Sequence, residues 1–262
     1  MKKFCLIFII TMMYNGSAEV YAQEGQDFHS NKVIAHRGAF KKNGYPENSL
    51  ASLQQAVKLG CEGSEFDVWM TKDGILVVNH DADFEGMHIE DSTYEELLQK
   101  MHPNGENIPT AEAYLLEGMK QHGTKLIFEI KPSKDKALGL ELAEKSVALV
   151  HRIQAREWVD YISFDYDICK KVMALDPKAN VAYLNGDLSP EALKKDGFFG
   201  LDYHLQVLKK HPGWIKEAKA LGLTINAWTV NKPEDMKWLL EQGADFITTN
   251  EPELLLDIIK QK

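Results

Sequence analysis

The first strand–helix–strand unit of the chain reads VIAHRGAFKKNGYPENSLASLQQAVKLGCEGSEFDVW from Val33 to Trp69. It opens with an apolar run at Val33–Ala35 and closes with one at Phe66–Trp69. Between them, Ser49–Leu59 repeats apolar residues at helical spacing, and Gly60 follows as a helix stop. Two strands joined by a helical crossover lie parallel in one sheet. This unit therefore predicts an α/β fold with a parallel sheet.

The same alternation continues to the C-terminus, with helical patterns such as Leu138–Val150 between the apolar runs. Ile75–Val78 follows Phe66–Trp69 after a five-residue turn, which is too short for a parallel crossover, so the two runs form a hairpin. Excluding Ile75–Val78 leaves eight strands, and about 250 residues is the usual size of a (β/α)8 TIM barrel. The predicted strands are Val33–Ala35, Phe66–Trp69, Leu126–Ile130, Val159–Phe164, Val181–Leu184, Phe198–Leu201, Leu223–Val230 and Phe246–Thr248.

One segment interrupts the alternation. Residues 82–109, after the third strand-like run, are polar and contain a short helical piece at Thr93–Lys100. A connection of this length in a compact domain is usually functional or a small subdomain. We therefore expect an insertion in the barrel, of a role that the sequence leaves open.

The N-terminus has the pattern of a secretory signal peptide. Lys2 and Lys3 precede the apolar run Phe4–Met13, and small residues end at Ala22. An uncleaved anchor is the alternative, but an almost unbroken apolar run of ten residues is short for a membrane span. The sequence thus predicts a signal peptide at residues 1–22, a barrel domain at 23–262, and export to the periplasm or the cell exterior.

The charge of the chain limits its partners. Without the predicted signal peptide, 28 basic and 38 acidic residues give a net charge of −10. Such a chain has little long-range attraction for nucleic acid or anionic membranes, and no stable membrane insertion is expected after cleavage. Cys61 and Cys169 are expected to be buried free thiols, since a domain of this size needs no disulfide. The oligomeric state stays open.

Three carboxylates are predicted to meet at the C-terminal ends of the strands, where barrel enzymes have their active sites. Glu65 and Asp67 are two positions apart on one strand face, and Glu129 and Lys131 share a face of the next barrel strand. Enclosed carboxylates need a counter-charge, and oxygen ligands suit a hard divalent cation such as Ca²⁺ or Mg²⁺. The alternative is a set of salt bridges to Arg37 and Lys131.

His36 and His80 lie at strand ends near these carboxylates. Two histidines can divide the general-base and general-acid roles, and with a cation they suit displacement at phosphorus. A zinc hydrolase also remains open from residue types alone, although the sequence has no His-x-His pair on a strand.

Several motifs occur together at compatible spacing. They are His36-Arg37-Gly38, Pro46-Glu47-Asn48-Ser49, Glu65-Phe66-Asp67-Val68, Thr71-Lys72-Asp73-Gly74, His80-Asp81, Glu129-Ile130-Lys131, Ser163-Phe164, Trp228-Thr229-Val230, Gly243-Ala244-Asp245 and Thr248-Thr249-Asn250-Glu251-Pro252. In this order, they resemble the motifs of the glycerophosphodiester phosphodiesterase family. The resemblance covers residues 32–258, nearly the whole predicted mature chain.

This resemblance implies a metal-dependent TIM-barrel hydrolase of glycerophosphodiesters that releases glycerol 3-phosphate and an alcohol. Glu47 would be a polar residue of the site, or alternatively a charge near a helix N-terminus. Trp228 would form an apolar wall over the glycerol, or alternatively a core aromatic. The remaining implied roles are acid/base for His36 and His80, metal binding for Glu65, Asp67 and Glu129, and phosphate binding for Arg37 and Lys131.

The chain departs from the family pattern after His80-Asp81. Many members continue with a leucine and an Arg-Thr-Thr stretch, whereas this chain continues with Ala82-Asp83-Phe84. The preference for the leaving alcohol therefore does not carry over. Two alternative functions are a related barrel phospholipase, acting on lysophospholipids or phosphoinositide-type substrates, and a catalytically silent module that binds phosphorylated ligands.

Overall fold

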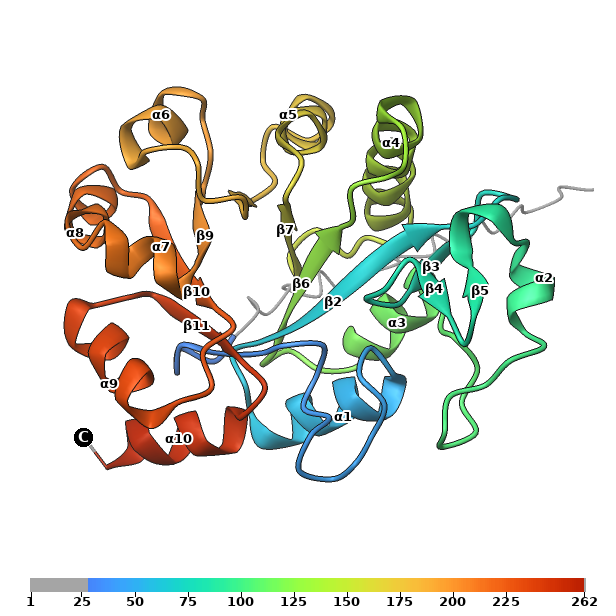
Figure 1. Cartoon of the computed structure of the whole chain (residues 1–262), viewed down its shortest axis with the longest axis horizontal. Coiled ribbons are helices and arrows are strands. Elements are labelled where there is room, and N and C mark those ends of the chain that lie inside the picture. The colour runs from blue at the N-terminus through green and yellow to red at the C-terminus, as the bar shows by residue number, and fades with distance from the viewer. Residues whose placement is uncertain (1–27, 262) are drawn as a thin grey trace, which may run out of the picture.

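Eight parallel strands close into a barrel in the computed structural model, which describes residues 28–261 (Figure 1). Strand β1 pairs in parallel with both β11 and β2 and so closes the sheet. The barrel strands are β1 (Val33–Ala35), β2 (Gly63–Met70), β6 (Lys125–Ile130), β7 (Val159–Ser163), β8 (Val181–Tyr183), β9 (Gly200–His204), β10 (Thr224–Trp228) and β11 (Phe246–Thr249). The predicted (β/α)8 fold is confirmed. Each predicted strand overlaps one barrel strand, but the bounds differ: the run predicted at Phe198–Leu201 is a strand only from Gly200, and β9 continues to His204.

Helices form the outer ring around the strands (Figure 1). They are α1 (Leu50–Leu59), α3 (Ala111–Gly118), α4 (Lys136–Arg152), α5 (Tyr166–Leu175), α6 (Pro190–Lys195), α7 (Leu205–Lys210), α8 (Gly213–Ala220), α9 (Pro233–Gln242) and α10 (Pro252–Lys260). The sequence specifies several helix ends directly: Ser49 caps α1 by accepting from the Ser52 amide, and Gly60 ends it in the left-handed conformation. None of the helices in residues 28–261 combines the length and hydropathy needed to cross a bilayer.

The predicted hairpin is also present. Strand β3 (Leu76–Val78) pairs antiparallel with β2 outside the closed barrel. The insertion follows β3 and contains β4 (Asp83–Phe84), β5 (Met87–His88), the short 3-10 helix η1 (Ile89–Asp91) and α2 (Tyr94–Leu97). It extends to one side of the barrel (Figure 1). Its helix is shorter than the predicted Thr93–Lys100. The capping box at Thr93 starts α2 at Tyr94, and the helix ends at Leu97.

Successive residues of the barrel strands point alternately outward and inward, and they contribute to two separate apolar cores. Residues such as Phe66 and Phe128 point outward and pack beneath the helices, where Phe66 stacks on Tyr114. Ile34 and Ile127 belong to a smaller apolar layer inside the barrel. The charged residues on β2 and β6 alternate with the outward-facing ones, so they point into the barrel, as the sequence predicted.

Cys61 and Cys169 are buried free thiols, as predicted. The predicted signal peptide, residues 1–22, lies outside the described residues.

An ion cluster around the buried Asp176 joins α4 to the end of α5 and allows a first prediction. Asp176 accepts hydrogen bonds from Arg156 Nε and from His151 Nε2, each at 2.7 Å. Burial disfavours the charged form of Asp176, but these hydrogen bonds outweigh it and lower its pKa to about 2. Because the folded pKa lies below the ordinary value, ionised Asp176 stabilises the fold above about pH 4, and this stabilisation is lost as pH falls towards 2.

We expect Asp176→Asn to lower the free energy of unfolding at pH 7 by about 1–2 kcal/mol, allowing for the partial exposure of Arg156 and His151. Urea unfolding at pH 7 and pH 2.5 would measure the difference from wild type, which should shrink at the lower pH. Asp257→Asn, at an exposed position on α10, is the matched control and should change stability little at either pH. An equal cost of Asp176→Asn at both pH values would contradict the assignment.

Candidate active site

Seven of the nine predicted site residues line one cavity of about 90 Å³ at the C-terminal ends of the strands. They are His36, Arg37, Glu65, His80, Glu129, Lys131 and Trp228. The third predicted carboxylate, Asp67, is buried directly beside them. The residues that the sequence analysis selected from five separate segments thus meet in one place.

The three carboxylates form a compact cluster. One oxygen from each of Glu65, Asp67 and Glu129 lies within 4.8 Å of the others, and all three residues are buried. Burial and the two neighbouring carboxylates raise the pKa of Glu65 well above its ordinary value, and burial raises the pKa of Glu129 to about 8. Both carboxyl groups are thus harder to ionise here than in water, and a bound cation would favour their charged forms.

Two cations of the chain compensate part of this charge. Lys131 Nζ lies 3.1 Å from Asp67 Oδ1 and 2.8 Å from Glu129 Oε1. Arg37 Nε lies 3.7 Å from Asp67 Oδ2. Although burial opposes ionisation of Asp67, Lys131 and the other positive neighbours lower its pKa. The alternative of barrel-interior salt bridges is therefore partly realised, at Asp67 and Glu129.

Neither Arg37 nor Lys131 forms a salt bridge with the Glu65 side chain. Its Oε2 accepts a hydrogen bond from the Arg37 amide at 2.8 Å, but its Oε1 is buried and has no hydrogen-bond partner within residues 28–261. A buried, unpaired carboxylate oxygen facing two other carboxylates fits a divalent cation held by Glu65, Asp67 and Glu129. The donors are all oxygen, which favours a hard ion over zinc.

The loop after β1 is shaped by its backbone. Arg37 has a left-handed conformation (φ 54°), and its carbonyl accepts hydrogen bonds from the Asn48 amide and the Ser52 hydroxyl. Gly38 also has positive φ, and a Cβ there would lie 2.4 Å from Ser52 Oγ. The glycine of the His-Arg-Gly motif therefore lets this loop pack tightly against α1, which directs His36 and Arg37 into the cavity.

His36 is oriented by a residue near the C-terminus. Its Nδ1 lies 2.7 Å from Asn250 Oδ1, and because an amide oxygen only accepts, Nδ1 carries the proton. Its Nε2, 3.9 Å from Glu65 Oε2, is then the free nitrogen. Burial, together with the positive charge of Arg37, lowers the pKa of His36 to about 4. At neutral pH, His36 is thus an uncharged imidazole able to accept a proton.

His80 has a different environment. Its Nδ1 lies 2.7 Å from Asp81 Oδ1, and its side chain is about one-third exposed. The indole of Trp69 on β2 donates a hydrogen bond to the His80 carbonyl at 3.2 Å, which ties the end of the hairpin to the barrel. The neighbouring carboxylate of Asp81 can balance the charge of a protonated His80 ring.

Glu47 does not line the cavity. Both of its carboxylate oxygens accept from Arg37 Nη1 at 2.9 Å, and its side chain is 41% exposed. It lies before the cap of α1, and its contact is with Arg37. Glu47 therefore acts on the site by holding the guanidinium of Arg37.

Trp228, at the end of β10, forms the opposite wall. Its indole nitrogen donates to the Asp202 carbonyl at 2.9 Å, and its ring packs edge-to-face against Phe164 and His204. Phe164 lines the same cavity. Trp228 therefore presents a fixed aromatic surface across from the charged cluster.

Two asparagines of this site were not predicted from the sequence. Asn48 Nδ2 donates to Asp67 Oδ2 at 2.8 Å, and its Oδ1 accepts from the Asp67 amide at 3.1 Å. Asn48 also has positive φ (59°), which asparagine tolerates better than most residues. Asn250 orients His36 as described above. The positions of both within the Pro-Glu-Asn and Thr-Thr-Asn motifs were the available signals.

Comparisons with known proteins identify what this site is similar to. The model of the glycerophosphoryl diester phosphodiesterase family matches residues 36–254. A glycerophosphodiester phosphodiesterase of Caldanaerobacter subterraneus is 32% identical, covering 87% of this chain and 98% of the relative. The crystal structure of a glycerophosphodiester phosphodiesterase from Parabacteroides distasonis is 46% identical with a TM-score of 0.86, covering 89% of this chain and 98% of that one.

A second similar structure contains a ligand. It is a phosphodiesterase of Oleispira antarctica in complex with the product sn-glycerol-3-phosphate. That protein is 26% identical with a TM-score of 0.76, and the match covers 87% of this chain and 96% of the other.

Proposed function

Because the chain belongs to the glycerophosphoryl diester phosphodiesterase family, we propose that it hydrolyses glycerophosphodiesters with a divalent cation and two histidines, releasing glycerol 3-phosphate and an alcohol. The phosphodiesterase activity follows from the family. The observation that supports the finer mechanism is the meeting of three buried carboxylates and two histidines around one cavity.

The cation would be Ca²⁺ or Mg²⁺, held by Glu65, Asp67 and Glu129. The unpaired Glu65 Oε1 and the raised pKa of Glu129 support this assignment. When bound, such an ion supplies positive charge to the non-bridging oxygens of a phosphodiester.

Arg37 and Lys131 are proposed to bind the phosphate. Both line the cavity, and both already have carboxylate partners that hold them in place. Their fixed positive charges would stabilise the charge that develops on the phosphoryl oxygens during displacement. Trp228 would contact the carbon atoms of the glycerol from the opposite wall.

We assign the two histidines different roles. His36 is neutral near pH 7 and has Nε2 free, so it would take the proton from the attacking hydroxyl. His80, beside Asp81, would give a proton to the leaving alcohol oxygen. The attacking group is water in direct hydrolysis, or the glycerol 2-hydroxyl if a cyclic phosphate forms first.

Substitution of Asn250 tests the tautomer of His36, on which this assignment depends. Because the amide oxygen of Asn250 keeps the proton on Nδ1 of His36, Asn250→Ala should lower kcat by about 10–100-fold with little change in KM. Asn250→Asp keeps an acceptor and should retain most of the activity. Nitrogen NMR shifts of His36 would report the tautomer directly, and an unchanged tautomer in Asn250→Ala would contradict the assignment.

The proposed substrate class can be tested with the purified protein. Glycerophosphocholine, glycerophosphoethanolamine, glycerophosphoglycerol and glycerophosphoinositol would be supplied separately, with enzymatic detection of glycerol 3-phosphate. We expect glycerol 3-phosphate from at least one of them in the presence of Ca²⁺ or Mg²⁺. Phosphorus NMR during the reaction would reveal a cyclic phosphate, and release of inorganic phosphate or of no product would contradict the proposal.

The alternative functions have less support. The relatives reported above are named as phosphodiesterases, and two of them as glycerophosphodiester phosphodiesterases. A silent binding module would be expected to lack a histidine or a carboxylate of the site, whereas all five are present.

We further propose that the chain is exported to the periplasm or the cell exterior, with removal of residues 1–22 as a signal peptide. Lys2, Lys3 and the apolar run Phe4–Met13 support this. N-terminal sequencing of the protein from the producing cell should begin at Gln23, and a start at Met1 would contradict it.

A further inference from the structure

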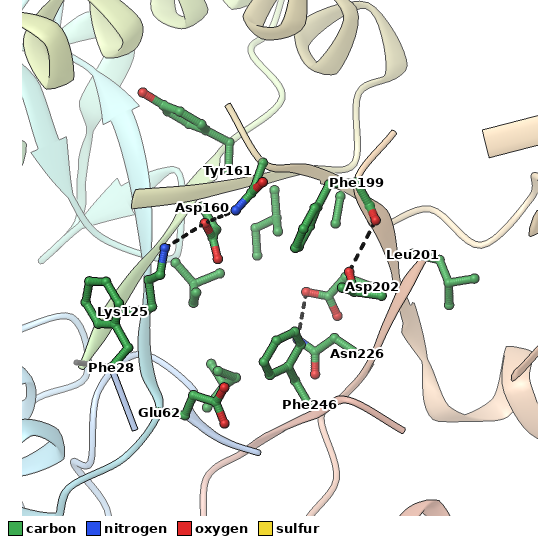
Figure 2. Close-up of a pocket in the computed structure, with 16 residues that line it drawn as sticks. Phe28, Glu62, Lys125, Asp160, Tyr161, Phe199, Leu201, Asp202, Asn226 and Phe246 are labelled. Carbon is green, nitrogen blue, oxygen red and sulfur yellow. Dashed lines mark hydrogen bonds and ion pairs between the residues drawn. The ribbon is translucent and has the colours of Figure 1, made fainter. Parts of the chain in front are cut away.

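A second cavity lies at the opposite, N-terminal end of the barrel (Figure 2). Its volume is about 190 Å³, and its lining includes Lys125, Thr224 and Phe246, the first residues of β6, β10 and β11. The active site of a barrel enzyme lies at the other end, so the chemistry described above gives no role to this lower cavity.

The walls of the lower cavity are mainly apolar. Ile34, Ile127, Ile162, Ala182 and Phe246 contribute their side chains to it. An engineered apolar cavity of about 150 Å³ in another protein binds benzene, so a cavity of this size can hold a six-membered ring or a short alkyl chain.

Its inner end has two hydrogen-bond acceptors without donors. Asn226 Nδ2 donates to Asp202 Oδ2 at 2.9 Å and to Thr248 Oγ1 at 2.8 Å, so its amide hydrogens are engaged. Asp202 Oδ1 and Asn226 Oδ1 are buried and have no hydrogen-bond partner within residues 28–261. Both residues are more than nine-tenths buried, and their pairing is visible to the right in Figure 2. An occupant that offers several donors would satisfy both oxygens.

The charges of the lining favour a cation. Lys125 is the only cationic side chain that lines this cavity in the described part of the chain, and its Nζ lies 3.3 Å from Asp160 Oδ1 (left in Figure 2). Asp160 thus offsets Lys125. Glu62 and Asp202 then remain as acidic residues of the lining without a cationic partner in it. Burial raises the pKa of both carboxyl groups, that of Asp202 to about 7, so a cationic ligand would favour their charged forms. A carboxylate ligand would add a like charge here, whereas an ammonium would balance one.

We propose that the lower cavity binds a small primary amine with an apolar body of about six to eight carbon atoms. The ammonium group contacts Asp202 Oδ1 and Asn226 Oδ1, and the apolar body packs against Ile34, Ile127 and Phe246. Asp202 and Ile162 line both this cavity and the active-site cavity, but neither has a part in the proposed phosphodiesterase chemistry, and the proposal does not depend on that chemistry.

Titration calorimetry with phenethylamine tests the proposal on the purified protein. 2-Phenylethanol and 3-phenylpropionate are matched probes, which replace the ammonium with one hydroxyl or with a carboxylate. We expect phenethylamine to bind wild type at least tenfold more tightly than either. Since binding is measured as heat, the result is independent of whether the chain hydrolyses glycerophosphodiesters.

Two variants and one control variant locate the binding site. Ala182→Leu fills the lower cavity from β8 and should weaken phenethylamine binding at least tenfold, while Ala148→Leu, on the exposed face of α4, should not change it. Asp202→Asn should weaken binding of the amine more than binding of the alcohol. Circular dichroism and the melting temperature of each variant check the fold.

Three results would overturn the proposal. They are absence of phenethylamine binding up to millimolar concentration, undiminished binding by a folded Ala182→Leu, and equal affinity for the amine, the alcohol and the carboxylate. In the first case, the lower cavity holds solvent only.

Discussion

Replacing His36 with alanine should lower kcat for glycerophosphodiester hydrolysis by about 10³-fold, because positioned general acid–base groups contribute about 10²–10⁴-fold to a rate. The expectation follows from its environment: His36 is buried, uncharged near pH 7, and held by Asn250 with Nε2 facing the carboxylate cluster. Release of glycerol 3-phosphate under saturating substrate would measure the loss. His211→Ala, which removes a ring stacked on Trp214 in the outer helix layer, is the control and should leave kcat within about twofold.

The partner histidine should show a different dependence on the leaving group. If His80 protonates the leaving oxygen, His80→Ala should cost about 10³-fold with glycerophosphocholine. With a p-nitrophenyl ester of glycerol 3-phosphate the same variant should lose less than about tenfold, because p-nitrophenolate leaves without protonation. His36→Ala should lose activity with both substrates. Equal losses of activity in His80→Ala on the two substrates would assign His80 to another role. An unchanged rate in either variant would remove the substituted histidine from the mechanism.

The barrel could be predicted because its signals are local. The alternation of Glu65, Phe66 and Asp67 shows which side chains share a face, and the short turn before Ile75 excludes a parallel partner. Each of these patterns lies within about ten residues. The structure confirms both, as the antiparallel register of Val68 with Val78 shows.

The insertion was less predictable, because its elements are short. Strands β4 and β5 have two residues each, which leaves no room for a period-two pattern. The turn between them places Glu85 (φ 47°) and Gly86 (φ 83°) in the left-handed region, as in a two-residue hairpin loop. Glu-Gly is a weaker signal for such a turn than Asn-Gly or Asp-Gly.

The candidate site was predicted where residue type alone limits the chemistry. Buried carboxylates and histidines at strand ends are few, so Glu65, Glu129 and His36 stand out. Asn250 could not be assigned in this way, because its role depends on a contact with His36 that spans 214 positions. Only the closed barrel, in which β1 lies beside β11, brings the two together.

Removal of the cation should abolish the activity. We expect exhaustive treatment with EDTA to lower turnover by at least about 10³-fold, since several kcal/mol of charge stabilisation would be lost, and Ca²⁺ or Mg²⁺ to restore it. The same cation should raise the melting temperature of the treated protein, because it binds only where folding brings Glu65, Asp67 and Glu129 within 4.8 Å.

Asp67→Asn separates binding of the cation from any other effect of EDTA. The substitution keeps the shape of the side chain and leaves the Asp67 backbone amide free to donate to Asn48, but it removes the charge that faces Lys131. Its affinity for Ca²⁺, measured by calorimetry, should fall at least 100-fold, and added cation should no longer raise the melting temperature. Asp257→Asn removes the same charge from the exposed face of α10 and should bind like wild type. Full activity after chelation would refute the requirement for a cation. Undiminished Ca²⁺ binding by Asp67→Asn would place the cation away from this cluster, because neutralising one of three carboxylates removes a third of the charge that attracts the cation.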